Sequence, residues 1–215
     1  MIEVNSQTDF VARDDNFASF VDQLLNQAVD TKATDVSAIL TDDTEQKRTA
    51  LVTKLGENIN VRRLASLQAQ QNQHIGVYVH TNKRIAAIAL ISGGDTALAK
   101  SVAMHIAASK PLVVNPADVD ESVVAKEKEI YTQQALDSGK PAEIAEKMVV
   151  GRVKKFLAEV SLTEQNFVVE PDKTVGQLLK DAGATAQSFV LYTLGEGIEK
   201  EEVDFAQEVQ ASLNA

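Results

Sequence analysis

The stretch of sequence that decides the fold is NSQTDFVARDDN, residues 5–16. It follows MIEV, residues 1–4, in which apolar and polar side chains alternate as they do in a half-buried strand. It precedes residues 17–28, in which apolar side chains recur at intervals of three and four and form one face of a helix. Asn16, or Asp15 before it, is a suitable N-cap for that helix. The stretch is therefore the turn between a strand and a helix.

Phe10 stands out in this turn, because the turn is otherwise polar and Phe10 directly follows a carboxylate, Asp9. One interpretation is a hydrophobic staple, in which the ring packs on the following helix. The other is an exposed wedge that enters a pocket of another protein, as large aromatic side chains do at binding interfaces. The residues by themselves leave both interpretations open.

The composition excludes several classes of function. The chain has 215 residues, no cysteine, three histidines far apart in the sequence and a formal net charge of −10. Disulfides and thiolate metal sites are excluded, a histidine zinc site is not expected, and the acidic charge argues against direct binding of nucleic acid. No apolar run approaches the roughly 20 residues of a membrane span. We expect a soluble, cytoplasmic protein without a metal, a cofactor or a membrane segment.

Apolar periodicity and turn residues predict the remaining elements of the chain. Gly56 stands where helices commonly end in the left-handed conformation. Helices are predicted at residues 44–55, 97–109, 120–139, 140–160, 174–183 and 200–213. Strands are predicted at residues 58–67, 75–81, 84–92, 166–170 and 188–194.

The order of strand, polar turn and helix at the start of the chain has a weak counterpart at residues 88–109. The two units predict an α+β fold made of two related α/β subdomains with small, mainly antiparallel sheets. A projecting antiparallel helical hairpin and a C-terminal helix complete it. The expected boundaries are 1–92 for the first subdomain, 93–118 with 161–197 for the second, 119–160 for the hairpin and 198–215 for the C-terminal helix.

The two helices of the predicted hairpin meet at Gly139, and Pro141 occupies the first turn of the second helix, where proline is tolerated. Helices joined by so short a turn lie antiparallel. Charged residues are dense on their outer faces, as in a projecting arm or a contact between two chains. A homodimer through this hairpin is therefore one expected assembly.

GDTALAKS, residues 94–101, is similar to a phosphate-binding loop, and it follows an apolar strand and opens a helix. Ala99 replaces the second glycine of that motif, and Leu98 is in phase with the apolar face of the helix. An ordinary helix start, capped near Asp95 or Thr96, is therefore the preferred interpretation, and we expect no bound nucleotide.

His105 falls on the apolar face of the helix predicted at residues 97–109. It is either a core histidine or a partner-facing residue at the edge of that face. The acidic pair Asp14 and Asp15 lacks the glycine and the later glutamate of an EF-hand, so it is interpreted as helix capping. No catalytic set of side chains can be assembled from the sequence, and we expect no enzyme.

Seven segments of the chain carry a resemblance to a known family. They are NSQTDFVA (5–12), GENINVRR (56–63), MHIAASKP (104–111), SGKPAEIAEKMVVGRVKKF (138–156), EVSLTEQNFV (159–168), KTVGQLL (173–179) and GEGIEK (195–200). In this order they closely resemble translation elongation factor Ts, the nucleotide-exchange factor of elongation factor Tu, over essentially the whole chain. Ser6 stands where the family commonly has cysteine, and Asn166 where it commonly has proline.

The resemblance implies a partner-binding segment that consists of Thr8, Asp9, Phe10 and Val11. In the family this segment enters beside the magnesium site of elongation factor Tu. Phe10 would insert between two helices of the GTPase domain of Tu and shift the groups that hold Mg²⁺. No covalent chemistry is implied.

The resemblance also implies a supporting contact surface at Leu55, Gly56 and His105. The hairpin at residues 140–156 matches the projecting arm of the family. The family normally begins with a small helical domain that docks on Tu, and this chain is expected to start after it, inside the first core strand. The implied function is guanine-nucleotide exchange on elongation factor Tu.

Two other classes of function compete with nucleotide exchange. The first is a non-catalytic dimerisation or scaffold protein that is built on the helical hairpin and in which Phe10 is merely packed. The second is a nucleotide hydrolase that uses residues 94–101. Substitution of Phe10 by alanine separates the scaffold protein from the exchange factor, because a packed ring would lower the thermal stability and a wedge would lower nucleotide release. Absence of GTP binding by the isolated chain would remove the hydrolase.

Overall fold

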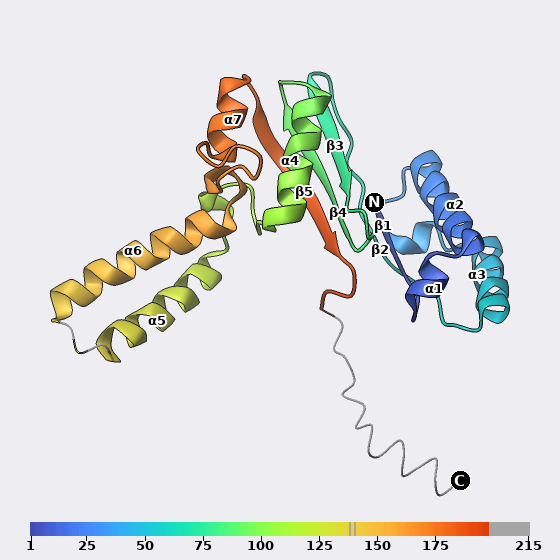
Figure 1. The fold of residues 1–215 in the computed structure, drawn as a ribbon, viewed down its shortest axis with the longest axis horizontal. Coiled ribbons are helices and arrows are strands. Elements are labelled where there is room, and N and C mark those ends of the chain that lie inside the picture. The colour runs from blue at the N-terminus through green and yellow to red at the C-terminus, as the bar shows by residue number, and fades with distance from the viewer. Residues whose placement is uncertain (138, 140, 198–215) are drawn as a thin grey trace, which may run out of the picture.

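Two separate antiparallel sheets divide the molecule into two subdomains. The computed structural model describes residues 1–137, 139 and 141–197, and in these residues the sheets have the strand orders β1-β2 and β3-β4-β5. Figure 1 shows the β3-β4-β5 sheet in the middle, the helices α1, α2 and α3 on one side and the hairpin of α5 and α6 on the other. The α+β class expected from the sequence is confirmed.

The first subdomain packs three helices on the two-stranded sheet. Its core is the buried face of α2 together with residues from α1, α3, β2 and the connecting segments, and it includes Leu24 and Ile39, which are fully buried. The elements are β1 (Ile2–Asn5), α1 (Asp9–Ala12), α2 (Asp15–Thr31), η1 (Val36–Ala38), α3 (Asp42–Leu55) and β2 (Asn60–Leu64).

The second subdomain packs α4 on one face of the three-stranded sheet (Figure 1). Buried alanines on β4 and α4 let the helix approach the sheet closely, and Ile91 and Ile106 fill the rest of the interface. The elements are β3 (Gln73–Val79), β4 (Ile85–Ser92), α4 (Thr96–Ser109), η2 (Pro116–Asp118), η3 (Leu162–Glu164), α7 (Val175–Asp181) and β5 (Thr185–Thr193).

The boundary between the subdomains differs from the expected one at residue 92. β4 pairs with β3 on one side and, along its whole length, with β5 on the other, and the β3-β4 hairpin contributes to the core of the second subdomain. The first subdomain therefore ends with β2, and residues 65–72 connect the two sheets. The sequence predicted both strands but did not indicate their partner, because β5 follows β4 by more than ninety residues in the chain.

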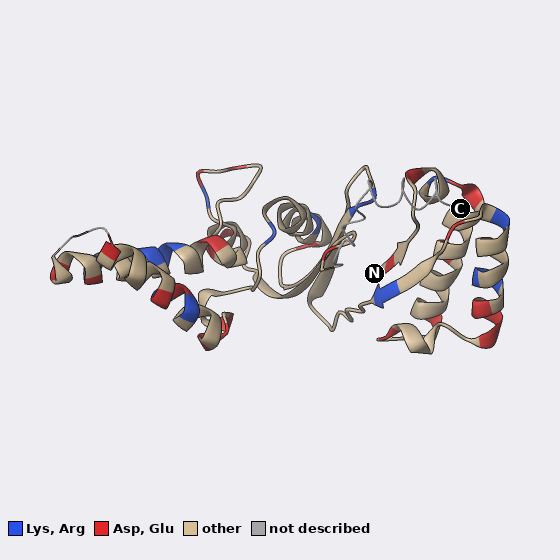
Figure 2. Ribbon diagram, turned by 90° about the horizontal axis from the view of Figure 1, so that it is seen from below, with Lys and Arg blue, Asp and Glu red and all other residues tan. Residues whose placement is uncertain are grey.

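The hairpin consists of α5 (Glu121–Asp137) and α6 (Ala142–Val160), with Gly139 at a φ of 68° in the turn. Ala135, Ala145 and Val149 form its small buried core. Acidic and basic residues are both present along each of the two helices (Figure 2). The hairpin is confirmed as a projecting arm, and the homodimer through it stays a prediction.

Several local details differ from the sequence prediction. The N-cap of α2 is Asp14, whose carboxylate accepts from the backbone N–H groups of Asn16 and Phe17, and neither Asp15 nor Asn16, the two caps expected, has that role. The strand predicted at residues 166–170 is wrong, because this segment is a turn closed by the bonds from Phe167 N to Lys173 O and from Glu170 N to Phe167 O. The helix predicted at residues 200–213 lies outside the described residues.

A buried carboxylate joins the two subdomains. Glu3 on β1 has only 5% of its surface exposed, and its two oxygens accept hydrogen bonds from Arg62 Nη1 at 2.9 Å and Arg63 Nε at 2.5 Å. Consecutive residues of a strand normally point to opposite faces. Here Glu3 pairs with Arg63 while Val4 pairs with Val61, so Arg62 is the extra residue of a β-bulge, which turns its side chain to the same carboxylate.

The same arginines reach across to the end of β5. Arg63 donates to Thr193 O at 3.1 Å and lies 4.0 Å from the centre of the Tyr192 ring, while Arg62 donates to the carbonyl of Glu196. We call Glu3, Arg62 and Arg63 the inter-subdomain clasp. It connects the sheet that carries the Phe10 turn to the last strand of the second subdomain.

We expect Glu3→Gln to destabilise the protein by about 2 kcal/mol, because hydrogen bonds to a charged, buried group are lost. Burial raises the pKa of Glu3, but the hydrogen bonds from Arg62 and Arg63 outweigh it and hold the pKa below its usual value. The folded state therefore resists protonation, so this contribution is complete above the unfolded pKa of about 4.3 and is lost as the pH falls through the lower folded pKa.

Urea unfolding of the wild type and Glu3→Gln at pH 7 and at pH 3 measures both effects. The difference between the two proteins should shrink at the lower pH. Glu143→Gln is the control, because its pair with Lys147 is exposed on both sides and should not matter for stability. An equal difference at both pH values would contradict the assignment of the effect to the charge of Glu3.

Candidate protein-binding site

The Phe10 turn is a single helical turn that presents its aromatic ring to solvent. Thr8 is the N-cap of α1, and its hydroxyl accepts from Val11 N at 3.4 Å. Val11 points into the core of the first subdomain, whereas Phe10 points to solvent and is 82% exposed. Asp9 pairs with Arg13 at 2.9 Å on the outer side of the turn. Phe10 is therefore not a staple on α2, and of the two interpretations only the exposed aromatic agrees with the structure.

The carboxylate of Glu57 binds the backbone just before Phe10. Its Oε2 accepts from Gln7 N at 3.1 Å and from Thr8 N at 2.9 Å, and its Oε1 accepts from the Thr8 hydroxyl at 2.5 Å. The hydrogen bond from the Thr8 side chain, followed by those from the two backbone groups, lowers the pKa of Glu57 below its usual value. The carboxylate is thus ionised at neutral pH and connects two segments about fifty residues apart in the sequence.

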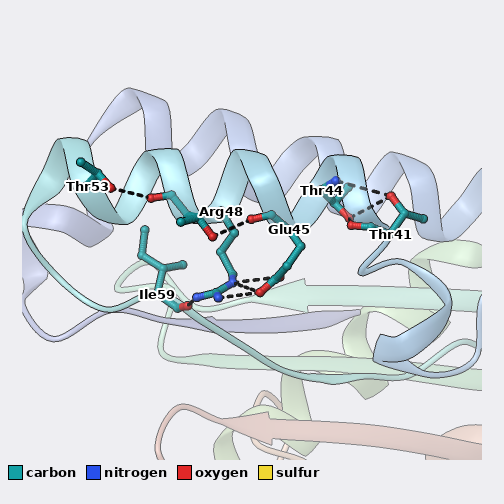
Figure 3. A network of polar contacts seen from close by, with 7 residues as sticks. Thr41, Thr44, Glu45, Arg48, Thr53 and Ile59 are labelled. Carbon is teal, nitrogen blue, oxygen red and sulfur yellow. Dashed lines mark hydrogen bonds and ion pairs between the residues drawn. The ribbon is translucent and has the colours of Figure 1, made fainter.

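Glu57 occupies this position because of how α3 ends. Gly56 ends the helix at a φ of 75°, a left-handed conformation that glycine adopts without strain. Arg48 donates to Ile59 O at 2.8 Å and is itself held by the carboxylate of Glu45 (Figure 3). The turn after α3 is therefore fixed to the helix at two points, one on each side of Glu57.

The structure brings Leu55 and Gly56, two of the three residues of the predicted supporting surface, together with the predicted segment at residues 8–11. Leu55 and Gly56 directly precede Glu57, so they lie at the foot of the Phe10 turn. Lys54 on the same helix donates to Asn16 Oδ1 at 2.8 Å, which connects the end of α3 to the start of α2. Sequence analysis missed Glu57, although its place in the GENINVRR segment beside Gly56 was available as a signal.

His105 is not part of this site. Its side chain is fully buried in the core of the second subdomain, where its ring lies 5.9 Å from that of Phe167. Its Nδ1 accepts from Val168 N at 3.3 Å, which requires Nε2 to carry the proton and donate to Gln165 Oε1 at 3.0 Å. Burial lowers the pKa of His105, so the ring is neutral at pH 7. The core interpretation agrees with the structure.

His105 nevertheless shapes a surface. The backbone that it holds carries Val168 and Val169, which are 40% and 64% exposed. The imidazole itself has no free face for a partner, since both nitrogens are bonded within the chain. Any contribution of His105 to binding therefore passes through residues 167–169.

The similarity of residues 94–101 to a phosphate-binding loop has no structural counterpart. The carboxylate of Asp95 caps α4 by accepting from Leu98 N at 2.7 Å, so a negative charge already occupies the helix start where a phosphate would bind. Ala99 is fully buried against β3. In the described part of the chain, no group of three or more acidic, histidine or cysteine side chains could hold a metal ion. None of the described helices is long and apolar enough to cross a membrane.

These observations define a class of protein. It is a two-subdomain α+β protein with a projecting helical arm, and its most prominent feature is an exposed aromatic residue on a braced turn, which suits contact with another protein. The model of the family described as Elongation factor TS matches residues 7–196 of the chain.

Relatives agree with the family match. Elongation factor Ts of Hahella chejuensis is 56% identical over 213 residues, an alignment that covers 99% of this chain and 73% of the relative. The proteins of the same name from Saccharophagus degradans and an Escherichia coli strain are 54% and 52% identical and are covered to 74% and 73%. The chain belongs to the elongation factor Ts family, a family of translation elongation factors.

Proposed function

We propose that the chain is a guanine-nucleotide exchange factor for elongation factor Tu. The observation that carries this proposal is the exposure of Phe10, at 82%, on a turn whose backbone is fixed by Thr8, Val11 and Glu57. A large apolar side chain held in water costs free energy, and aromatic residues in such positions are the typical anchors of protein interfaces. Membership of the elongation factor Ts family supports Tu as the partner.

The proposed mechanism acts on the Mg²⁺ ion of the partner. Bound GDP depends on Mg²⁺ to neutralise its phosphates, so a ring that displaces the groups around the metal weakens the binding of metal and nucleotide together. Thr8, Asp9 and Val11 present Phe10: Thr8 caps the turn, Asp9 pairs with Arg13 and Val11 anchors it in the core. The chain would supply binding energy only, and no covalent step is required.

Thermodynamic linkage makes the process reversible. If the chain lowers the affinity of Tu for GDP by some factor, then GDP lowers the affinity of Tu for the chain by the same factor. Either GDP or GTP can then displace the chain from nucleotide-free Tu. This behaviour distinguishes an exchange factor from a scaffold protein, whose binding would not respond to nucleotide.

The second subdomain is proposed to hold Tu at another place. The exposed pair Val168 and Val169 offers an apolar contact, and His105 fixes its backbone from inside. Leu55 and Gly56 would support the contact around Phe10. Two separated contacts on one partner would let binding energy from the second subdomain drive the insertion of Phe10 in the first.

Release of a fluorescent GDP from elongation factor Tu, followed by stopped flow, tests the proposal. Micromolar chain should accelerate release, and at equilibrium it should lower the affinity of Tu for GDP by roughly 5–150-fold, the usual size of a coupling between two binding sites. Excess unlabelled GDP should then dissociate the complex of the chain with Tu. Binding to Tu that ignores nucleotide and leaves its release unchanged would favour the scaffold function instead.

A further inference from the structure

We propose that Glu57 is the positioning residue that holds Phe10 at the angle at which it enters the partner. This inference rests on the proposed exchange function and adds to it a residue that does not itself touch the nucleotide or the metal. Its place in the structure is the carboxylate bridge between the end of α3 and the start of α1.

The α1 turn cannot hold its own geometry. It has four residues, and a helix of one turn fixes several dihedral angles for very few internal hydrogen bonds. Val11 is its single buried residue. Its other bonds, such as those from Ala12 N to Thr8 O and from Arg13 N to Phe10 O, lie within the turn itself. A second attachment to the rest of the subdomain is therefore needed to set the direction of Phe10.

Glu57 supplies that attachment through a short chain of bonds. Its Oε1 accepts from the Thr8 hydroxyl at 2.5 Å, and the same hydroxyl accepts from Val11 N inside the α1 turn. Its Oε2 accepts from the backbone N–H groups of Gln7 and Thr8, which fixes the direction in which the chain enters the turn. Three donors from two adjacent residues define an orientation as well as a distance.

The carboxylate of Glu57 makes its hydrogen bonds only to the residues that lead into the Phe10 turn. Among the described residues it takes part in no ion pair, and all of its hydrogen bonds go to Gln7 and Thr8. It is also mounted on a fixed support, since Gly56 ends α3 on one side and the bond from Arg48 to Ile59 holds the chain on the other. The three bonds use both oxygens of the carboxylate as acceptors. The side-chain amide of glutamine has only one acceptor oxygen, so it cannot form the same set of bonds.

The test compares Glu57→Gln with a matched control, Asp43→Asn. Both substitutions turn an acid on or next to α3 into its amide, but Asp43 pairs with Lys47 on the exposed face of the helix. Stopped-flow GDP release is measured over a range of concentrations of the chain. We expect Glu57→Gln to lower the maximal release rate by roughly tenfold, as small misplacements of acting groups do. The concentration at half-saturation should change less than twofold, and Asp43→Asn should change neither quantity.

A second readout reports on the turn without the partner. Hydrogen exchange of the Gln7 and Thr8 amides should become faster in Glu57→Gln and stay unchanged in Asp43→Asn, while the circular dichroism spectra show that both variants remain folded. The pair of substitutions Phe10→Ala and Glu57→Gln should release GDP no more slowly than Phe10→Ala alone, because Glu57 is proposed to act only through Phe10.

The outcomes separate the inference from the function on which it rests. If the wild type does not accelerate release, the proposed function fails and the role of Glu57 fails with it. If the wild type is active and Glu57→Gln keeps the full maximal rate, the exchange function stands and the positioning role is wrong. A further loss when Glu57→Gln is added to Phe10→Ala would also overturn it, because Glu57 would then act independently of the ring.

Discussion

Replacing Phe10 with alanine is expected to remove most of the nucleotide release from elongation factor Tu and to leave the fold intact. The ring is 82% exposed, so its removal takes away almost no buried contact within the chain. If Phe10 is an interface anchor, its loss should cost about 2 kcal/mol or more, which is roughly a thirtyfold fall in exchange efficiency. Stopped-flow release of fluorescent GDP and thermal unfolding of the same samples measure the two quantities.

Val29→Ala is the matched control for this substitution. Val29 is also an exposed apolar residue of the first subdomain, at 69%, but it lies at the far end of α2 from the Phe10 turn. It should leave exchange unchanged and should not lower the stability, because alanine forms helices at least as well as valine. A fall in the thermal midpoint with Phe10→Ala, together with unchanged release, would show that the ring contributes to the fold and would remove the wedge from the mechanism.

Gly76→Ala is expected to cause the largest loss of stability among single-methyl additions in the described chain. A Cβ atom built on Gly76 in β3 would lie 2.0 Å from the carbonyl carbon and oxygen of Ala99 and 2.4 Å from Lys100 N. All three are backbone atoms of α4, so no side-chain rotation can relieve the overlap. The helix would have to leave the sheet, at a cost at or above the upper end of the roughly 1–3 kcal/mol usual for overpacking.

Gly151→Ala adds the same methyl group where there is room for it. Gly151 lies within α6, and apart from its chain neighbours and the backbone of its own helix no atom comes within 4 Å of the position of its added Cβ. Alanine is the better helix former by roughly 0.5–1 kcal/mol, so this variant should be slightly more stable than the wild type. Urea unfolding followed by circular dichroism compares the two. Equal stability of the Gly76 and Gly151 variants would contradict the close contact between α4 and β3.

Local patterns in the sequence predicted the helices well. The spacing of Phe17, Phe20 and Leu24 predicted the buried face of α2, and all three are buried. Gly56 ends α3 in the left-handed conformation, as expected, and Gly139 lies in the turn of the hairpin. Such features can be predicted from sequence because a helix is built from contacts between residues three and four apart. Its buried face and its caps therefore depend on the residues of one short segment.

The sequence was a poorer guide to the pairing of the strands and to the packing of the second subdomain. The apolar residues at 166–170 have the composition of a strand, but the backbone of this segment bonds to Lys173 and His105 and forms a turn. His105 itself was compatible with two environments until Gln165 and Val168 were seen to occupy both ring nitrogens. Local propensity cannot decide such cases, since what matters is which distant group satisfies each donor and acceptor.

The sequence by itself determined the family, the long helices of the described chain, the glycine that ends α3, and the segment that carries Phe10. The tertiary structure alone decided that Phe10 is exposed, that a β-bulge turns Arg62 and Arg63 to one carboxylate, and that Glu57 braces the Phe10 turn. The reason is the same in each case. These features depend on bonds between residues about fifty or more positions apart, and no local periodicity records which distant segments the folded chain brings together.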